Sequence, residues 1–241
     1  MPGMLKQTLP ALVIGIALVP NAAIAQMSPQ PPMPMVVDLH KVELGSWASY
    51  AMTMGEMSMT TKLALVARDA KSVAMETSME GGMMAMMGGK MTVKLVMDPD
   101  PTTAAKPIKQ MVLQIGNQDP MLAPDTMPAQ KYSKPDPKTL VGKETIKVAA
   151  GSFKTAHYRN KTEQGAVDVW VSEDAPPTGL VKLTTPPMQA GGQQIPGMAM
   201  ELAAMGKGAK PIITKPPKPF DPQKMMGGSA SSPDGKKKGK R

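Results

Sequence analysis

Methionine thioethers are the side chains in this 241-residue sequence whose spacing most clearly suggests chemistry. Many of the 26 methionines recur at every second position, as in Met52-Thr53-Met54 and Met57-Ser58-Met59. Side chains two positions apart lie on one face of a β-strand, about 6.6 Å from each other. Because a thioether is apolar, soft and polarizable, such a face can pack as a core, bind an apolar ligand or coordinate a soft ion such as Cu(I).

The alternating methionines are predicted chiefly to pack as core or to line an apolar cavity, since leucine or isoleucine would serve equally well at those positions. A hydrophobic or lipid-like ligand is the partner that such a face would accept. The predicted ligand-lining residues are Tyr50, Met52, Met54, Met57, Met59, Leu63, Met75, Met79, Met91 and Leu95.

A second group of methionines lacks this alternation. Four of them form a run between the glycine pairs Gly81-Gly82 and Gly88-Gly89, where a β-strand core does not require them. Cu(I) prefers soft sulfur ligands, so this run is the better candidate for a metal site, as an alternative to ligand binding. The candidate metal ligands are Met83, Met84, Met86 and Met87.

Other chemistry finds little support in the sequence. The two imidazoles, His40 and His157, form no His-x-His array, so a zinc site is not predicted and His157 is expected to be a hydrogen-bonded structural residue. There is no cysteine nucleophile and no Gly-x-Ser-x-Gly motif. Glu173 and Asp174 are adjacent, so on a strand they would point to opposite faces. We therefore expect no enzyme and no cofactor other than the Cu(I) alternative.

The elements that would position the methionines are short strands. From Val36 to Thr214 the sequence alternates apolar and polar residues between turns, and no long helical pattern interrupts it. One strand is expected to place Met75 among its apolar face and Ala74, Glu76, Ser78 and Glu80 on the polar face. The predicted fold is all-β: a strongly curved antiparallel sheet or open half-barrel of about 8–11 strands.

The first 25 residues are predicted to be a secretory signal peptide. Lys6 is followed by the apolar run Leu9–Val19 and by the small residues Ala23-Ile24-Ala25, so cleavage is expected between Ala25 and Gln26. No later run approaches the roughly 20 apolar residues of a membrane span, so no transmembrane segment is expected in the mature chain. The protein is therefore expected to be exported, to the periplasm or beyond the cell.

The remaining chain is divided by composition. Residues 26–35 are a Pro-rich linker, residues 36–214 a single β domain, and residues 215–241 a Lys-rich tail predicted to be disordered. The absence of cysteine excludes disulfides, so the domain must be stabilised by its core and its sheet.

The formal net charge of +9 is concentrated at one end. Residues 26–205 carry 17 basic and 17 acidic side chains, whereas residues 206–241 carry ten basic side chains against two acidic ones. A neutral folded region argues against nucleic-acid binding, which favours basic residues spread over a folded face. The tail could instead contact anionic surfaces of the cell envelope.

A series of motifs in the second half suggests a family. They are Val141-Gly-Lys-Glu144, Val148-Ala-Ala-Gly-Ser-Phe-Lys-Thr-Ala-His-Tyr-Arg159, Val169-Trp-Val-Ser172 and Gly179-Leu-Val-Lys182. This pattern resembles exported bacterial β-domains of the DUF3108 and DUF4412 type, and its architecture is distantly similar to the lipoprotein carriers LolA and LolB. The resemblance covers about Gly45 to Thr214. It implies a curved antiparallel sheet around an apolar cavity in the cell envelope, and no catalytic residue.

Overall fold

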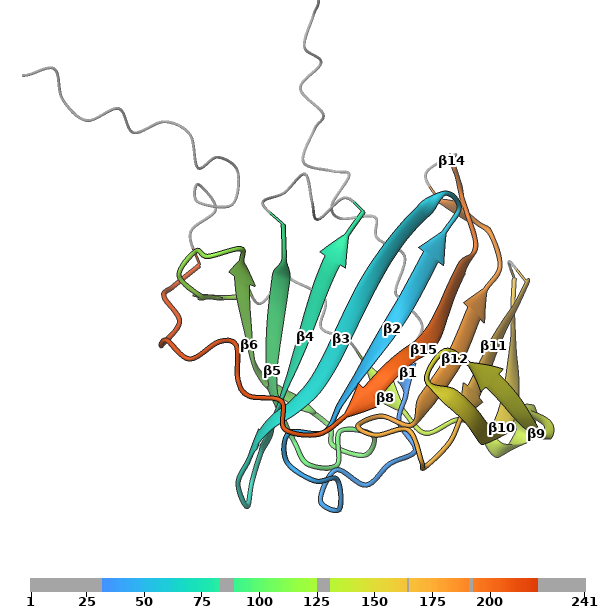
Figure 1. Ribbon diagram of the computed structural model, residues 1–241, viewed down its shortest axis with the longest axis horizontal. Coiled ribbons are helices and arrows are strands. Elements are labelled where there is room, and N and C mark those ends of the chain that lie inside the picture. The colour runs from blue at the N-terminus through green and yellow to red at the C-terminus, as the bar shows by residue number, and fades with distance from the viewer. Residues whose placement is uncertain (1–31, 83–88, 125–130, 164, 191–192, 221–241) are drawn as a thin grey trace, which may run out of the picture. The chain divides into compact units, whose positions relative to one another are not determined.

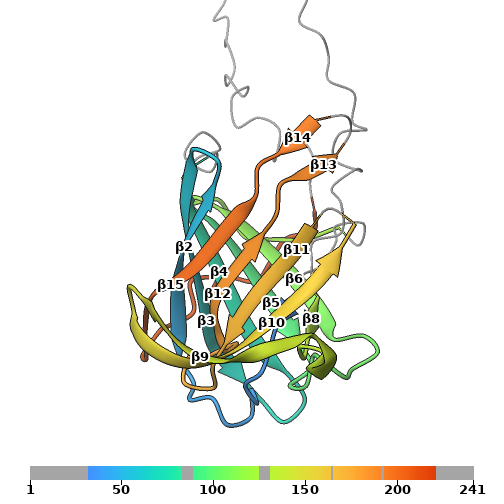
Figure 2. The same ribbon diagram turned by 90° about the vertical axis from the view of Figure 1, so that its right-hand side faces the viewer.

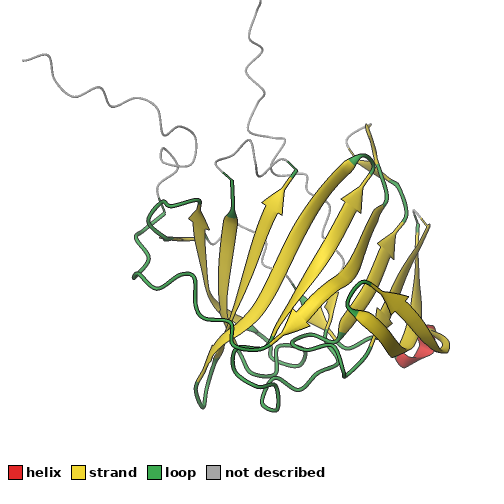
Figure 3. Ribbon diagram, viewed as in Figure 1, coloured by secondary structure: helices red, strands yellow, loops and turns green. Residues whose placement is uncertain are grey.

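The structure is a computed structural model that describes residues 32–82, 89–124, 131–163, 165–190 and 193–220. Within these residues the fold is all-β, with one short 3-10 helix, η2 (Pro137–Thr139), and no α-helix (Figure 3). No helix in this part of the chain is long and apolar enough to cross a membrane. The strands are β1 (Met33–Pro34), β2 (Trp47–Met54), β3 (Met57–Arg68), β4 (Val73–Gly81), β5 (Met91–Met97), β6 (Ile108–Ile115), β7 (Met121–Leu122), β8 (Tyr132–Ser133), β9 (Leu140–Val148), β10 (Gly151–Thr162), β11 (Gly165–Val171), β12 (Leu180–Thr185), β13 (Met188–Ala190), β14 (Gln193–Ile195) and β15 (Met198–Gly206).

Eleven strands form one sheet in the order β7-β6-β5-β4-β3-β2-β15-β12-β11-β10-β9 (Figure 1). All neighbouring strands in it are antiparallel. The sheet curves strongly, so that β10 to β12 and β15 lie in front of β4 to β6 in the view of Figure 2. It does not close, because β7 and β9 remain its edges. The predicted open, curved antiparallel sheet is therefore confirmed.

The alternation of the sequence decides which face each residue occupies. A two-residue turn, Gly55-Glu56, joins β2 to β3 and pairs Met54 with Met57, and Gly55 accepts the positive φ of +58° that this turn requires. Since side chains alternate along a strand, this register places every second residue of both strands on one face. We call the face that carries Tyr50 the inner face and the opposite one the outer face.

The main core lies against the inner face. Buried side chains from β2 to β5, β10 to β12 and β15 join it, and the segment before β2 adds Met35, Leu39 and Val42. Full burial of one such side chain contributes about 1.5–3 kcal/mol. At its centre the hydroxyl of Tyr50 donates to the carbonyl of Leu180 at 3.2 Å, and burial raises the pKa of Tyr50 to about 12. Residues 35–42, which precede β2 in sequence, therefore supply part of the core that stabilises the sheet.

Residues 207–220, which we call the C-terminal strap, run across one end of the outer face from β15 to β7 (Figure 1). Glu76 is only 2% exposed, and its carboxylate accepts the backbone N–H groups of Ile212 at 2.6 Å and Ile213 at 3.1 Å. The Lys94 ammonium donates to the Ile213 carbonyl at 3.3 Å. The polar face of β4 that the alternation predicts is buried at Ala74, Glu76 and Ser78 and exposed at Glu80.

Both ends of the described chain contact the fold. Met33 and Pro34, within the predicted linker, pair with Tyr132 and Ser133 in a parallel two-stranded ladder. In the strap, Lys218 exchanges backbone hydrogen bonds with Pro120 and Leu122. Residues 215–220 thus pack at the β7 edge, although composition assigns them to the tail. Residues 1–31 and 221–241, which hold the predicted signal peptide and the rest of the predicted linker and tail, lie outside the described residues.

Candidate functional site

Eight inner-face methionines gather at the end of the sheet where the β2–β3 turn lies; we call them the methionine cluster. Register places Met52 opposite Met59 and Met200, and Met54 opposite Met57. On neighbouring strands Met79 is likewise opposite Met91. Directly opposed residues have Cβ atoms about 4.5–5.5 Å apart, close enough for their thioethers to meet. The methionine cluster comprises Met52, Met54, Met57, Met59, Met79, Met91, Met198 and Met200.

The cluster is a half-exposed continuation of the main core. Met200 is buried at 5% exposure, whereas Met57 is 39% exposed and the other members are intermediate. Met52 and Met198 pack against the main core. The Thr61 hydroxyl donates to the Met52 sulfur at 3.0 Å. Apolar side chains of adjustable shape are therefore accessible at this end of the sheet.

The predicted ligand-lining residues divide into two groups in the structure. Tyr50, Leu63, Met75 and Leu95 are at most 4% exposed and belong to the packed core. The remaining members of that set, all methionines, belong to the methionine cluster. Met198 and Met200 were missed by the sequence analysis, although they show the same Met-x-Met spacing. Met198 and Met200 reach the site because β15 pairs with β2, although the two strands are far apart in sequence.

Two predicted sites fall outside the described residues: the candidate metal ligands Met83, Met84, Met86 and Met87, and the cleavage site Ala25–Gln26. The structure describes the two strands that flank the Met83–Met87 run. β4 ends at Gly81, opposite Met59, and β5 begins at Met91, which belongs to the methionine cluster.

The outer face of β9 to β11 carries a polar network around His157. Its Nε2 lies 2.6 Å from the Asp168 carboxylate, and its Nδ1 lies 3.4 Å from the Glu144 carboxylate. The ring stacks on Trp170 with centroids 4.2 Å apart, and the Trp170 indole N–H donates to Glu144 at 2.7 Å. The two carboxylates lie on opposite sides of the ring. His157 is thus hydrogen-bonded, as the sequence predicts.

A pH-dependent contribution to stability is expected from Asp168. Burial opposes its ionisation, but the hydrogen bonds and positive charges of Arg159 and His157 outweigh burial, so the pKa of Asp168 lies below its usual value. Such a carboxylate stabilises the fold above its unfolded pKa, about 3.9, and this contribution is lost as the pH falls through the lower folded pKa. Asp168→Asn should therefore be less stable than wild type at pH 6, and the difference should shrink below about pH 4.

Urea denaturation across this pH range measures the effect, with Asp174→Asn as the control because Asp174 is exposed. A stability difference for Asp168→Asn that does not change with pH would contradict the electrostatic explanation.

The described residues contain no group of three or more His, Asp and Glu side chains that could hold a metal ion. Glu173 and Asp174 lie in the loop between β11 and β12, so the alternation of side chains along a strand does not apply to them. The methionine cluster is consequently the candidate site with the clearest geometry.

Comparison with known proteins adds little at the level of sequence. No family model matches this chain, and no curated protein matches it either, so the resemblance to DUF3108 and DUF4412 domains stays an interpretation of the motifs. Among solved structures, a proposed lipoprotein from Parabacteroides distasonis is 12% identical with a TM-score of 0.31, over 68% of this chain and 96% of that chain. A proposed exported protein with a YmcC-like fold from Bacteroides fragilis is 10% identical with a TM-score of 0.26, over 68% of this chain and 97% of that chain.

Proposed function

We propose that this chain is a non-enzymatic exported β-protein that binds an apolar, lipid-like ligand at the methionine cluster. The observation that carries the proposal is the opposed register of the cluster methionines on β2 to β5 and β15. Charged residues of these strands, such as Lys62, Glu80 and Glu201, alternate with the cluster and therefore face away from it. The side chains that the cluster itself exposes at this end of the inner face are thus apolar.

Methionine suits a ligand of this class because its unbranched side chain adapts its shape at little cost. An alkyl chain laid on the cluster would remove from water the exposed parts of Met54 and Met57, at about 25 cal/mol per Å² of apolar surface. The main core below the cluster is already packed, so a ligand would extend that core rather than enter it.

The direct test is titration of the purified protein with a fluorescent C16 fatty-acid analogue. Saturable binding is expected, and Met54→Ser/Met57→Ser should weaken it about tenfold, because two apolar contacts are lost. The matched control is Thr53→Ala/Ser58→Ala, a pair in the same hairpin on the opposite face. No saturable binding, or equal losses in both double variants, would contradict the proposal.

Cu(I) binding is the second candidate, favoured by the directly opposed sulfurs of Met52 with Met59 and Met54 with Met57. Substitution of these four residues by leucine separates the two functions, since leucine keeps the apolar face and removes the sulfurs. If the protein binds Cu(I), wild type should compete with a chromophoric chelator for Cu(I) under anaerobic conditions and the four-leucine variant should not. Fatty-acid binding by the variant should persist. The Met83–Met87 run is proposed as a further source of sulfur ligands.

Export is proposed from the signal-peptide pattern of residues 1–25. The protein recovered from the periplasm of an expressing bacterium should begin at Gln26. N-terminal sequencing measures this directly, and recovery of the chain with Met1 in the cytoplasm would contradict it.

A further inference from the structure

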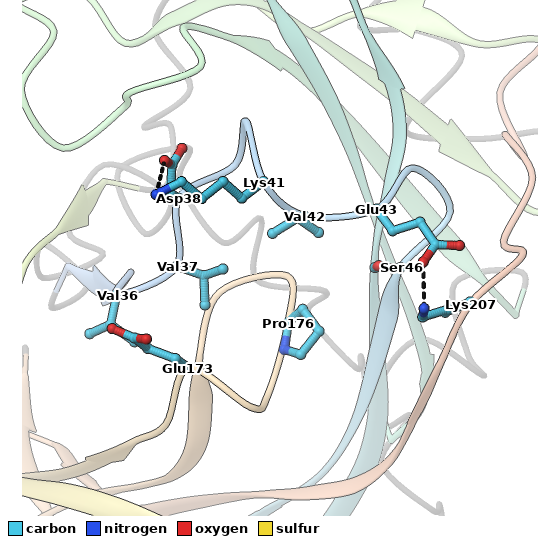
Figure 4. A pocket seen from close by; sticks show the side chains of 10 residues that line it. All are labelled: Val36, Val37, Asp38, Lys41, Val42, Glu43, Ser46, Glu173, Pro176 and Lys207. Atoms are coloured by element: carbon cyan, nitrogen blue, oxygen red, sulfur yellow. Dashed lines mark ion pairs between the residues drawn. The ribbon is translucent and has the colours of Figure 1, made fainter.

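A cavity of about 460 Å³ lies at the opposite end of the sheet from the methionine cluster (Figure 4). Ser46, which lines it, precedes the first residue of β2, whereas Met54 ends that strand, about 25 Å away along an extended chain. The walls come from residues 36–46, from the loop between β11 and β12, and from Lys207 after β15. The volume falls in the range of small-molecule sites, about 300–1,000 Å³.

Part of the cavity wall is apolar. Val36, Val37, Val42 and Pro176 line it, and the buried Ser46 adds a hydroxyl group. Val42 also belongs to the main core and is 5% exposed, so this part of the wall is firmly packed. A surface of valine methyl groups can take an alkyl chain of several carbons.

The charged residues around the cavity are paired with one exception. Asp38 pairs with Lys41 at 3.5 Å, and Glu43 pairs with Lys207, as the dashed lines in Figure 4 show. Among the described residues, Glu173 forms no ion pair, and it lines the cavity together with Val36 (Figure 4). Within this part of the chain, the lining therefore has one carboxylate without a counter-ion, in a partly apolar surrounding.

We propose that this cavity binds a small organic cation, an alkylammonium group whose chain lies on the valines and whose charge is next to Glu173. An ammonium ion supplies the charge that the lining lacks, whereas a carboxylate of the same length would be repelled by Glu173. The site is separate from the methionine cluster, so either site can be lost without the other.

The test is a titration of the protein with hexylammonium chloride and, separately, with sodium hexanoate, followed by the methyl NMR signals of Val36, Val37 and Val42. Hexylammonium should shift these signals in a saturable way, and hexanoate should bind at least about tenfold more weakly. Glu173→Gln should weaken hexylammonium binding by a similar factor. Asp174→Asn, an exposed neighbour that does not line the cavity, is the matched control and should bind like wild type.

Equal binding of the cation and the anion would overturn the proposal, as would unchanged binding by Glu173→Gln. Because Glu173 is exposed, its substitution should leave the thermal midpoint unchanged, which separates loss of the site from loss of the fold. The Met54→Ser/Met57→Ser protein should bind hexylammonium normally, so this experiment is independent of the proposed fatty-acid site.

Discussion

Glu76→Ala should lower the free energy of unfolding by about 2–4 kcal/mol, because it removes a buried carboxylate that accepts two backbone N–H groups of the C-terminal strap. Hydrogen bonds to a charged group are worth about 1.5–3 kcal/mol each, and donors left buried without a partner add a further cost. Without the carboxylate, the backbone N–H groups of Ile212 and Ile213 must either stay buried without a hydrogen-bond partner or be exposed to water as the strap detaches from β4. The second outcome would expose the side chain of Ile213, which is now 3% exposed.

Urea denaturation gives the stability change, and amide hydrogen exchange shows where it arises. Exchange should accelerate in the strap at Ile212 and Ile213 more than in β2 or β15. The control is Glu80→Ala on the same face of the same strand, where the carboxylate is exposed and pairs with Lys90 at 3.1 Å. A surface pair of this kind contributes at most about 1 kcal/mol. Equal effects of the two substitutions would show that the Glu76 carboxylate does not hold the strap.

The strap also shows why part of the fold could not be predicted. The alternation of Met52 to Met59 predicts both strands and their faces, because a period of two has one structural interpretation on a half-buried sheet. The buried state of Glu76 has no such signal. It depends on the backbone N–H groups of Ile212 and Ile213, which lie 136 and 137 residues further along the chain. A backbone hydrogen-bond donor cannot be recognised from the type of residue that carries it. Residues 207–220 are rich in Lys and Pro, a composition typical of a solvated tail.

The methionine face of the candidate site could be predicted from the sequence, but the boundary between its packed and accessible parts could not. The Met-x-Met spacing predicts an inner methionine face, and the strands place Met52, Met54, Met57 and Met59 on it. Period two does not indicate how far along a strand the packed core extends. That limit depends on residues 33–42, of which Met35, Leu39 and Val42 belong to the same packed core as Met75 and Leu95. Their own strand, β1, has only two residues, too few to show any periodicity.

The cavity beside Glu173 was missed for a similar reason. Its lining comes from the loop between β11 and β12 and from segments that precede and follow the sheet strands. Loop residues carry no periodic pattern, and their convergence depends on the ladder that places β15 between β2 and β12. In the sequence, Glu173 appeared only as half of an adjacent acidic pair.

Met75→Ala should mainly lower stability and Met57→Ala should mainly weaken ligand binding, and this contrast tests where the packed core ends. Met75 is fully buried, so its truncation leaves a cavity and should cost about 2–5 kcal/mol of stability. Met57 is 39% exposed, so its truncation should cost about 0.5 kcal/mol or less and should instead weaken fatty-acid binding.

Denaturation and fluorescence titration of the two variants measure both quantities, and Met75→Leu, which nearly conserves volume, is the control for the core position. If Met57→Ala destabilised the protein as much as Met75→Ala, the methionine cluster would be packed core in solution. The methionine side chains near the β2–β3 turn would then pack against other residues of the protein, and no accessible surface would remain there for a lipid-like ligand. If instead only Met75→Ala is destabilising, the inner face has a packed part and an accessible part, and ligand binding belongs to the second.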